Sequence, residues 1–100
     1  MRRGIRRVQT PVPMPEAIRR ALVYLDGRPR LYLSKPSEVA YEIWPGETFL
    51  RAQGAAGAGN RILRRAEKSG LAKWHSTDTD WGWHITAAGR AWLRDPKEIQ

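Results

Sequence analysis

One amphipathic segment, residues 58–68, constrains the fold of this chain more than any other feature. An α-helix turns by about 100° per residue, so Ile62, Leu63 and Ala66 would share one apolar side of such a helix. Four cationic side chains would gather within about 100° of arc on the opposite side: Arg61, Arg64, Arg65 and Lys68. Gly70 then suits the left-handed position that ends a helix. The segment therefore predicts a helix with one face for a protein core and one face for anions.

The beginning of this helix is harder to place because Gly54, Gly57 and Gly59 lie near its start. Each glycine inside a helix costs about 1 kcal/mol relative to alanine, since its backbone loses more freedom on folding. We therefore expect the firm helix to begin within residues 58–60, with earlier first turns left open. Residues 47–53, before the glycines, form too short a segment to assign.

Two helices and a short strand are predicted before this segment. Pro15 suits the first turn of a helix, and apolar residues recur at helical spacing after it. A turn at residues 26–29 and a short strand at residues 31–33 come next. A second apolar stripe over residues 39–44 predicts another helix, which Pro45 stops.

Alternation of apolar and polar residues predicts a β-hairpin over residues 72–85, with its loop around residue 78. A loop with an even number of residues would set Trp74 opposite Trp83. Four apolar side chains would then share one face of the hairpin: Trp74, Trp81, Trp83 and Ile85. Three polar side chains would share the other face: Lys73, His75 and His84. We expect the tryptophan face to belong to the core, with stacking on nucleic-acid bases as the alternative.

Thr86 has the side chain of a helix cap, so a last helix should follow the hairpin. The predicted order is helix, short strand, helix, helix, hairpin, helix, which makes a mainly helical α+β domain over residues 14–95. Residues 1–13, with two prolines and no sustained periodicity, are predicted to form a basic flexible arm, and residues 96–100 a tail.

The formal net charge of +8 comes partly from the arm and partly from the folded body. Four arginines lie in the arm: Arg2, Arg3, Arg6 and Arg7. Arginine outnumbers lysine by 14 to 4 in the whole chain, which favours bidentate recognition of phosphates or base edges. The arm is expected either to follow phosphates or the minor groove of DNA, or to be a disordered solubilising tail.

Several classes of protein are disfavoured by what the sequence lacks. The absence of cysteine excludes disulfides and thiolate metal sites. No apolar run is long enough to span a membrane, and the basic N-terminus lacks the apolar stretch of a secretory signal, so a cytoplasmic, nucleoid-associated protein is expected. His75 and His84 give no complete ligand set, which favours a surface hairpin over a metal site. Residues 54–59 lack the lysine of a phosphate loop, so we expect neither an enzyme nor a cofactor.

Two segments on either side of the hairpin resemble MarR-type winged helix regulators. Residues 60–71, Asn-Arg-Ile-Leu-Arg-Arg-Ala-Glu-Lys-Ser-Gly-Leu, are similar to the "LEKxGL" end of that family's recognition helix. Residues 85–93, Ile-Thr-Ala-Ala-Gly-Arg-Ala-Trp-Leu, are similar to its "LTxxGxxL" entry to the helix after the wing. The resemblance covers roughly residues 15–94 and implies a winged helix-turn-helix fold in which the third helix enters the DNA major groove.

The sequence departs from the MarR-type pattern in three places. The interval over residues 45–59 is longer and richer in glycine than the usual turn between the second and third helices. The long terminal helices through which those proteins dimerise have no counterpart, which leaves the choice between monomer and homodimer open. The wing tip, residues 77–80, is acidic where a phosphate-contacting wing usually carries Arg or Lys.

These features lead us to expect a binder of double-stranded DNA that acts as a small transcriptional regulator. Arg64 or Arg65 would bridge a guanine, Asn60 would pair with an adenine, and Lys68 would contact phosphate. The expected contact set also includes Arg61 on the same helix, Lys73 on the hairpin and the arginines of the arm: Arg2, Arg3, Arg6 and Arg7. The alternative is a winged helix that docks its basic helix onto an acidic protein partner.

Overall fold

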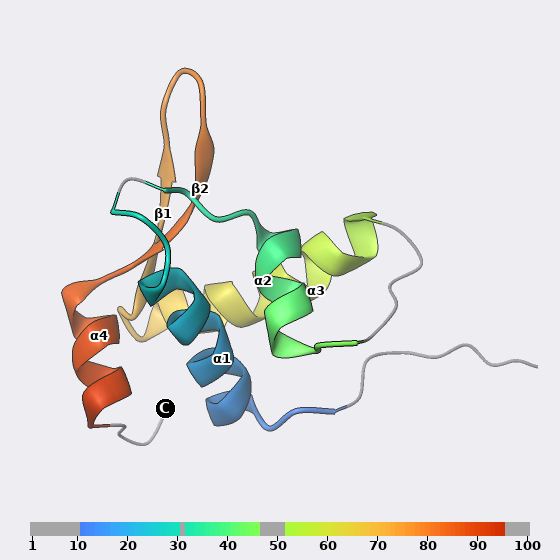
Figure 1. Cartoon of the computed structure of the whole chain (residues 1–100), viewed down its shortest axis with the longest axis vertical. Helices are drawn as coiled ribbons and strands as arrows, with labels where there is room; N and C mark the ends of the chain where they lie inside the picture. Colours follow the sequence, from blue (N-terminus) through green and yellow to red (C-terminus); the bar gives the residue numbers. More distant parts are fainter. Residues whose placement is uncertain (1–10, 31, 47–51, 96–100) are drawn as a thin grey trace, which may run out of the picture.

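Four helices surround the base of a β-hairpin that projects from the body of the molecule (Figure 1). The computed structural model describes residues 11–30, 32–46 and 52–95, with the side chains of residues 52 and 53 excluded. Within these residues the order is four helices and two strands: α1 (Met14–Asp26), α2 (Pro36–Ile43), α3 (Ala52–Lys68), β1 (Ala72–Ser76), β2 (Trp81–Ile85) and α4 (Ala87–Arg94). The described chain is therefore a small, mainly helical α+β domain, as the sequence predicts at that level.

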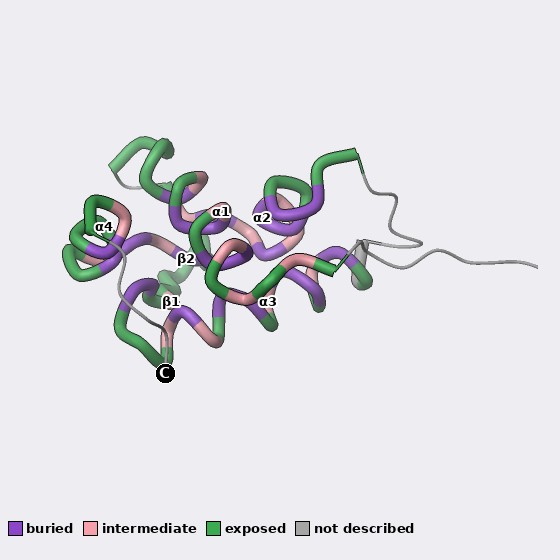
Figure 2. Tube along the Cα trace, turned by 90° about the horizontal axis from the view of Figure 1, so that it is seen from below, coloured by how far each residue is buried: buried purple, intermediate pink, exposed green. Residues whose placement is uncertain are grey.

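The core lies where the apolar faces of α1, α2 and α3 meet the base of the hairpin. Helix α1 buries one face through Ile18, Leu22 and Leu25, and α2 buries Val39 and Ile43 against it. Figure 2 shows the same alternation of buried and exposed residues along each helix, with the buried side turned inward. Full burial of one large apolar side chain is worth about 1.5–3 kcal/mol, so these stripes hold the three helices together.

Helix α3 begins at Ala52, so the start expected for the firm helix within residues 58–60 was too late, and the earlier turns that the sequence left open are helical. The first half of the helix buries Ala55 and Ala58 in the core, and this packing offsets the intrinsic cost of the glycines. Gly59 contributes directly, because a Cβ built there would lie 2.0 Å from the carbonyl oxygen of Pro36. The two helix backbones approach each other too closely at this point for any side chain to fit.

The C-terminal end of α3 has the geometry that the sequence predicts. Gly70 has a φ of 77°, and its N–H donates to the carbonyl of Glu67 at 2.9 Å. The N–H of Leu71 donates to the carbonyl of Ala66, also at 2.9 Å, which completes the bonding pattern of a Schellman motif. The Thr86 hydroxyl donates to the Gly70 carbonyl at 2.7 Å, so the two ends of the hairpin are joined at its base.

The hairpin pairs as predicted, with Trp74 opposite Trp83, and Thr86 caps α4 by accepting a hydrogen bond from the Gly89 N–H at 2.9 Å. The short strand expected at residues 31–33 is not formed by Tyr32 and Leu33, and residue 31 lies outside the described residues. A single antiparallel bridge joins Ser34 to Trp83 instead. Pro36 begins α2 two positions later, so the chain turns into a helix before it can pair further.

The prediction that the whole tryptophan face belongs to the core holds only for the base of the hairpin. Trp83 and Ile85 are buried, Trp74 is half-buried, and Trp81 remains 45% exposed. The helices pack against the base alone, while the rest of the hairpin extends beyond them (Figure 1). Separately, no helix within the described ranges is both long and apolar enough to cross a membrane.

Two neighbouring glycines of α3 should respond in opposite ways to replacement by alanine. The Gly59→Ala variant must push α2 away from α3, and we expect it to lose about 1–3 kcal/mol of unfolding free energy or more. At Gly57 a Cβ would meet nothing within 4 Å, so Gly57→Ala should gain up to about 1 kcal/mol from helix propensity alone. Urea unfolding followed by circular dichroism measures both. Equal effects of the two substitutions would contradict the close approach at Gly59.

Candidate nucleic-acid interface

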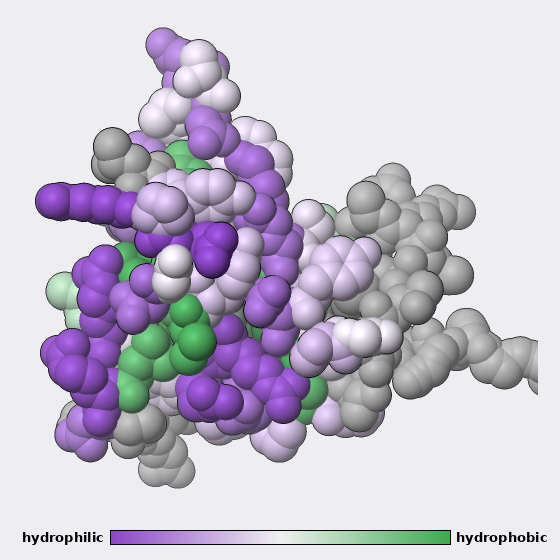
Figure 3. Space-filling view, viewed as in Figure 1, coloured by the Kyte–Doolittle hydropathy of each residue, from purple (hydrophilic) through white to green (hydrophobic). Residues whose placement is uncertain are grey.

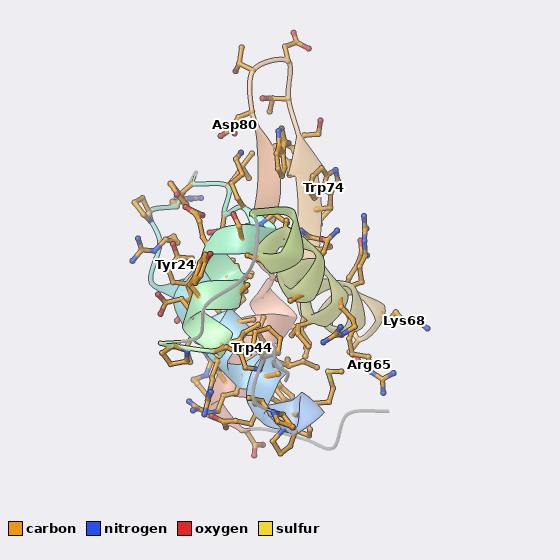
Figure 4. All side chains as sticks on the ribbon, turned by 90° about the vertical axis from the view of Figure 1, so that its right-hand side faces the viewer. Tyr24, Trp44, Arg65, Lys68, Trp74 and Asp80 are labelled. Carbon is orange, nitrogen blue, oxygen red and sulfur yellow. The ribbon has the colours of Figure 1, made fainter. Side chains whose placement is uncertain are left out.

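Helix α3 presents its cationic side chains on the face that points away from the core. Arg61, Arg64 and Lys68 are exposed and Arg65 is half-buried. Ile62, Leu63 and Ala66 are buried on the opposite side of the same turns. Figure 4 shows Arg65 and Lys68 at the outer side of α3. The structure thus brings together the four cations that helical spacing predicted, and we call them the α3 basic face.

The first half of the same helix face carries two exposed glycines, which have no side chain to project from the helix. Gly54 and Gly57 are exposed, and neither has a neighbour within 4 Å of the position that a Cβ would occupy. Helical spacing places both glycines in line with Arg61 and Lys68. The face therefore has bare backbone at its N-terminal half and positive charge at its C-terminal half.

Two arginines of the face, Arg64 and Arg61, differ in their surroundings. Arg64 donates to Glu67 at 3.2 Å, and its guanidinium carbon lies 5.2 Å from the centre of the Trp83 ring. Arg61 makes no ion pair with any residue that the structure describes. Since the Arg64–Glu67 pair is exposed, it is worth little and a stronger anion can replace it. Arg61 is thus available to a ligand without a competing ion pair, as is Lys68, which is exposed and makes no ion pair with a described residue either.

Asn60 and Lys73 are less favourably placed than the sequence suggests. Asn60 is half-buried, and its Oδ1 is shielded without a hydrogen-bond partner among the described residues, so the amide does not present both polar atoms to a base. Lys73 is exposed on β1, but strand alternation turns it away from the tryptophan face that Arg64 contacts. Arg2, Arg3, Arg6 and Arg7 lie outside the described residues.

The acidic tip of the hairpin is partly neutralised by a residue that the sequence analysis did not single out. Lys35, just before α2, donates to Asp80 Oδ1 at 2.6 Å and also to the carbonyl oxygen of Trp81. The Trp81 N–H donates to the same carboxylate oxygen at 2.8 Å. These two contacts, the lysine first, hold the pKa of Asp80 below its usual value. No sequence signal marks Lys35, because 45 positions separate it from Asp80.

The tip itself remains hydrophilic, as the space-filling view shows at the top of the molecule (Figure 3). With Asp80 paired to Lys35, Asp78 is the exposed carboxylate of the tip for which no ion pair with a described residue is seen. The repulsion that the hairpin would exert on a polyanion is therefore smaller than the sequence of the tip suggests.

The polar face of the hairpin lines a shallow cavity of about 410 Å³. The ring centres of His75 and His84 lie 6.2 Å apart at its wall, and Arg30 lines it from the loop before α2. Within the described part of the chain, no group of three or more His, Cys, Asp or Glu side chains could hold a metal ion.

Comparison of the sequence with protein-family models gives no match, and comparison with curated proteins gives none either. Assignment of a function therefore depends on the chemistry of the α3 basic face and the hairpin beside it.

The contact between Lys35 and Asp80 can be measured by titration. In the intact protein the Asp80 carboxyl should titrate below its ordinary pKa of 3.8. Replacing Lys35 by Gln should raise that pKa, because the largest cause of the shift is removed. The ion pair stabilises the fold only while Asp80 is ionised, so its contribution is present above the unfolded-state pKa and is lost as the pH falls through the folded-state value.

NMR of the Asp80 carboxyl carbon in wild type and in Lys35→Gln measures the pKa. The unfolding free energy of the same two proteins across acidic pH measures the contribution of the ion pair to stability. An Asp80 pKa that is the same with and without Lys35 would contradict the pairing.

Proposed function

We propose that this protein binds double-stranded DNA through the α3 basic face, as a winged helix-turn-helix domain of the kind found in MarR-type regulators. One observation carries the proposal. The solvent-exposed face of α3 has bare backbone at the glycines of its first half and exposed cations in its second half. A small transcriptional regulator is the role that fits such a domain.

The arrangement of elements supports a winged helix. Helix α2 packs closely on α3, and the β1–β2 hairpin follows α3 directly, as a wing follows a recognition helix. The bridge from Ser34 to Trp83 attaches the segment between α1 and α2 to the edge of the hairpin. The Arg64–Trp83 contact places the hairpin beside the basic face rather than behind the core.

The shape of the face suits the major groove. The groove of B-DNA is about 12 Å wide and admits one α-helix, whose approach is limited by the side chains it carries. Gly54 and Gly57 remove that limit in the first half of α3. Arg61, one turn further, is then in position for a guanine edge, and Lys68 near the C-terminal end for a phosphate.

The charge of the hairpin is compatible with this orientation. A polyanion next to two unpaired tip carboxylates would be repelled, but Lys35 compensates Asp80 at 2.6 Å. Affinity in such an interface comes chiefly from the cations that displace counterions from the phosphates, so it should depend steeply on salt.

Substitutions on α3 test the proposal. Arg61→Ala should cost about 1–3 kcal/mol of binding free energy and weaken the preference between duplex sequences, because it removes a base contact. Lys68→Ala should weaken binding to all sequences alike and lower the slope of log affinity against log salt by about one. Fluorescence anisotropy with random and selected duplexes over a salt series measures both effects.

Arg19→Ala is the matched control, since it removes the same charge from the exposed side of α1 while Glu16 keeps Arg20 as a partner at 2.9 Å. It should change affinity far less than either α3 variant. Absence of binding to any duplex at low salt would overturn the proposal, and the basic face would then belong to the docking of an acidic protein.

A further inference from the structure

The tryptophans of the hairpin form a continuous series of contacts that begins at α3 and runs outward. The Arg64 guanidinium lies 5.2 Å from the Trp83 ring, and Trp83 meets Trp74 edge to face at 5.7 Å. Trp74 in turn stacks on Trp81, with ring centres 5.4 Å apart and planes inclined by 29°. In Figure 4, Trp74 lies on the hairpin on the same side of the view as Arg65 and Lys68.

Burial falls along this series. Trp83 is fully buried and Trp74 half-buried, but Trp81 is 45% exposed even though Trp74 stacks against it. The Lys35 ammonium, 4.1 Å from the centre of the Trp81 ring, covers only part of it. A tryptophan exposed to this extent contributes little to the core, and its exposed ring is available for contact with another surface.

The surroundings of Trp81 favour a nucleic acid as that surface. Cations lie at both ends of the series. Arg64 lies at the helix, where it also pairs with Glu67. Lys35 lies at the outer ring, where it also pairs with Asp80. Indole rings flanked by cations are the arrangement with which proteins hold unpaired bases, since any base can stack on them while cations contact the backbone. A protein partner of the same surface would have to be acidic and apolar at once, and a DNA strand already meets both conditions.

We propose that Trp81, supported by Trp74, binds an unpaired DNA base next to the duplex that lies on α3. This inference rests on the proposed function and extends it: the protein would prefer duplexes that end in a single-stranded tail over blunt duplexes. The α3 basic face would hold the paired part, and the base that leaves the stack would lie against the exposed part of the indole ring.

The test compares three labelled DNAs that share one duplex by fluorescence anisotropy. One is blunt, one carries a short tail of thymidines, and one carries a tail of abasic residues with the same charge. Base stacking on an aromatic ring is worth about five- to hundredfold in affinity per base. We expect a gain of this size for the thymidine tail over both other DNAs.

Three variants assign that gain to the ring. Trp81→Ala should remove the preference for the thymidine tail and leave affinity for the blunt duplex within about twofold, whereas Trp81→Phe should keep most of the preference. Tyr41→Ala, which removes another aromatic residue that is 45% exposed but on α2, should leave all three affinities unchanged. Thermal unfolding of each variant establishes that the hairpin is intact.

The outcomes separate the two proposals. Binding of the blunt duplex that depends on Arg61 supports the proposed function whatever the tail does. Equal affinity for the thymidine and abasic tails, or an equal loss on all three DNAs in Trp81→Ala, would overturn the assignment of an unpaired base to Trp81.

Discussion

The burial of Trp83 is the interaction on which the rest of the structure depends. An isolated two-stranded hairpin is at best marginally stable in water, and β1 and β2 are only five residues each. Trp83 anchors the pair because its ring is enclosed by the helices while its backbone exchanges two hydrogen bonds with Ser34, at 2.9 and 3.0 Å. The same residue lies under the Arg64 guanidinium, so the position of the hairpin and the position of the basic face are coupled.

A second constraint sets which side of α3 faces the solvent. Gly59 brings α3 so close to Pro36 at the start of α2 that the helix cannot rotate without a clash. With that contact made, Ile62 and Leu63 are directed into the core and Arg61 and Lys68 into solvent. Packing on the inner face of α3 thus sets which charged side chains the outer face exposes. Like charges on adjacent turns of that face repel each other unless an anion is present.

Periodicity predicted a large part of this molecule. The two faces of α3, the Gly70 end, the pairing of Trp74 with Trp83 and the Thr86 cap all follow from local spacing, because each depends on residues close together in the chain. The start of α3 could not be predicted in this way, since the glycine propensity that argued against an early start is outweighed by packing on α2. The reduction of the strand to one bridge at Ser34 likewise depends on where β2 lies.

Local spacing was enough to predict the four helices apart from the start of α3, the hairpin register and the cationic composition of one helix face, since these arise from interactions within a few residues. How far the helices cover the hairpin, and therefore that Trp83 is core while Trp81 is exposed, depends on packing between segments far apart in the chain. The same holds for the ion pair of Lys35 with Asp80, which joins residues 45 positions apart. Alternation along a strand separates its two faces but carries no information about the length over which a neighbour buries one of them.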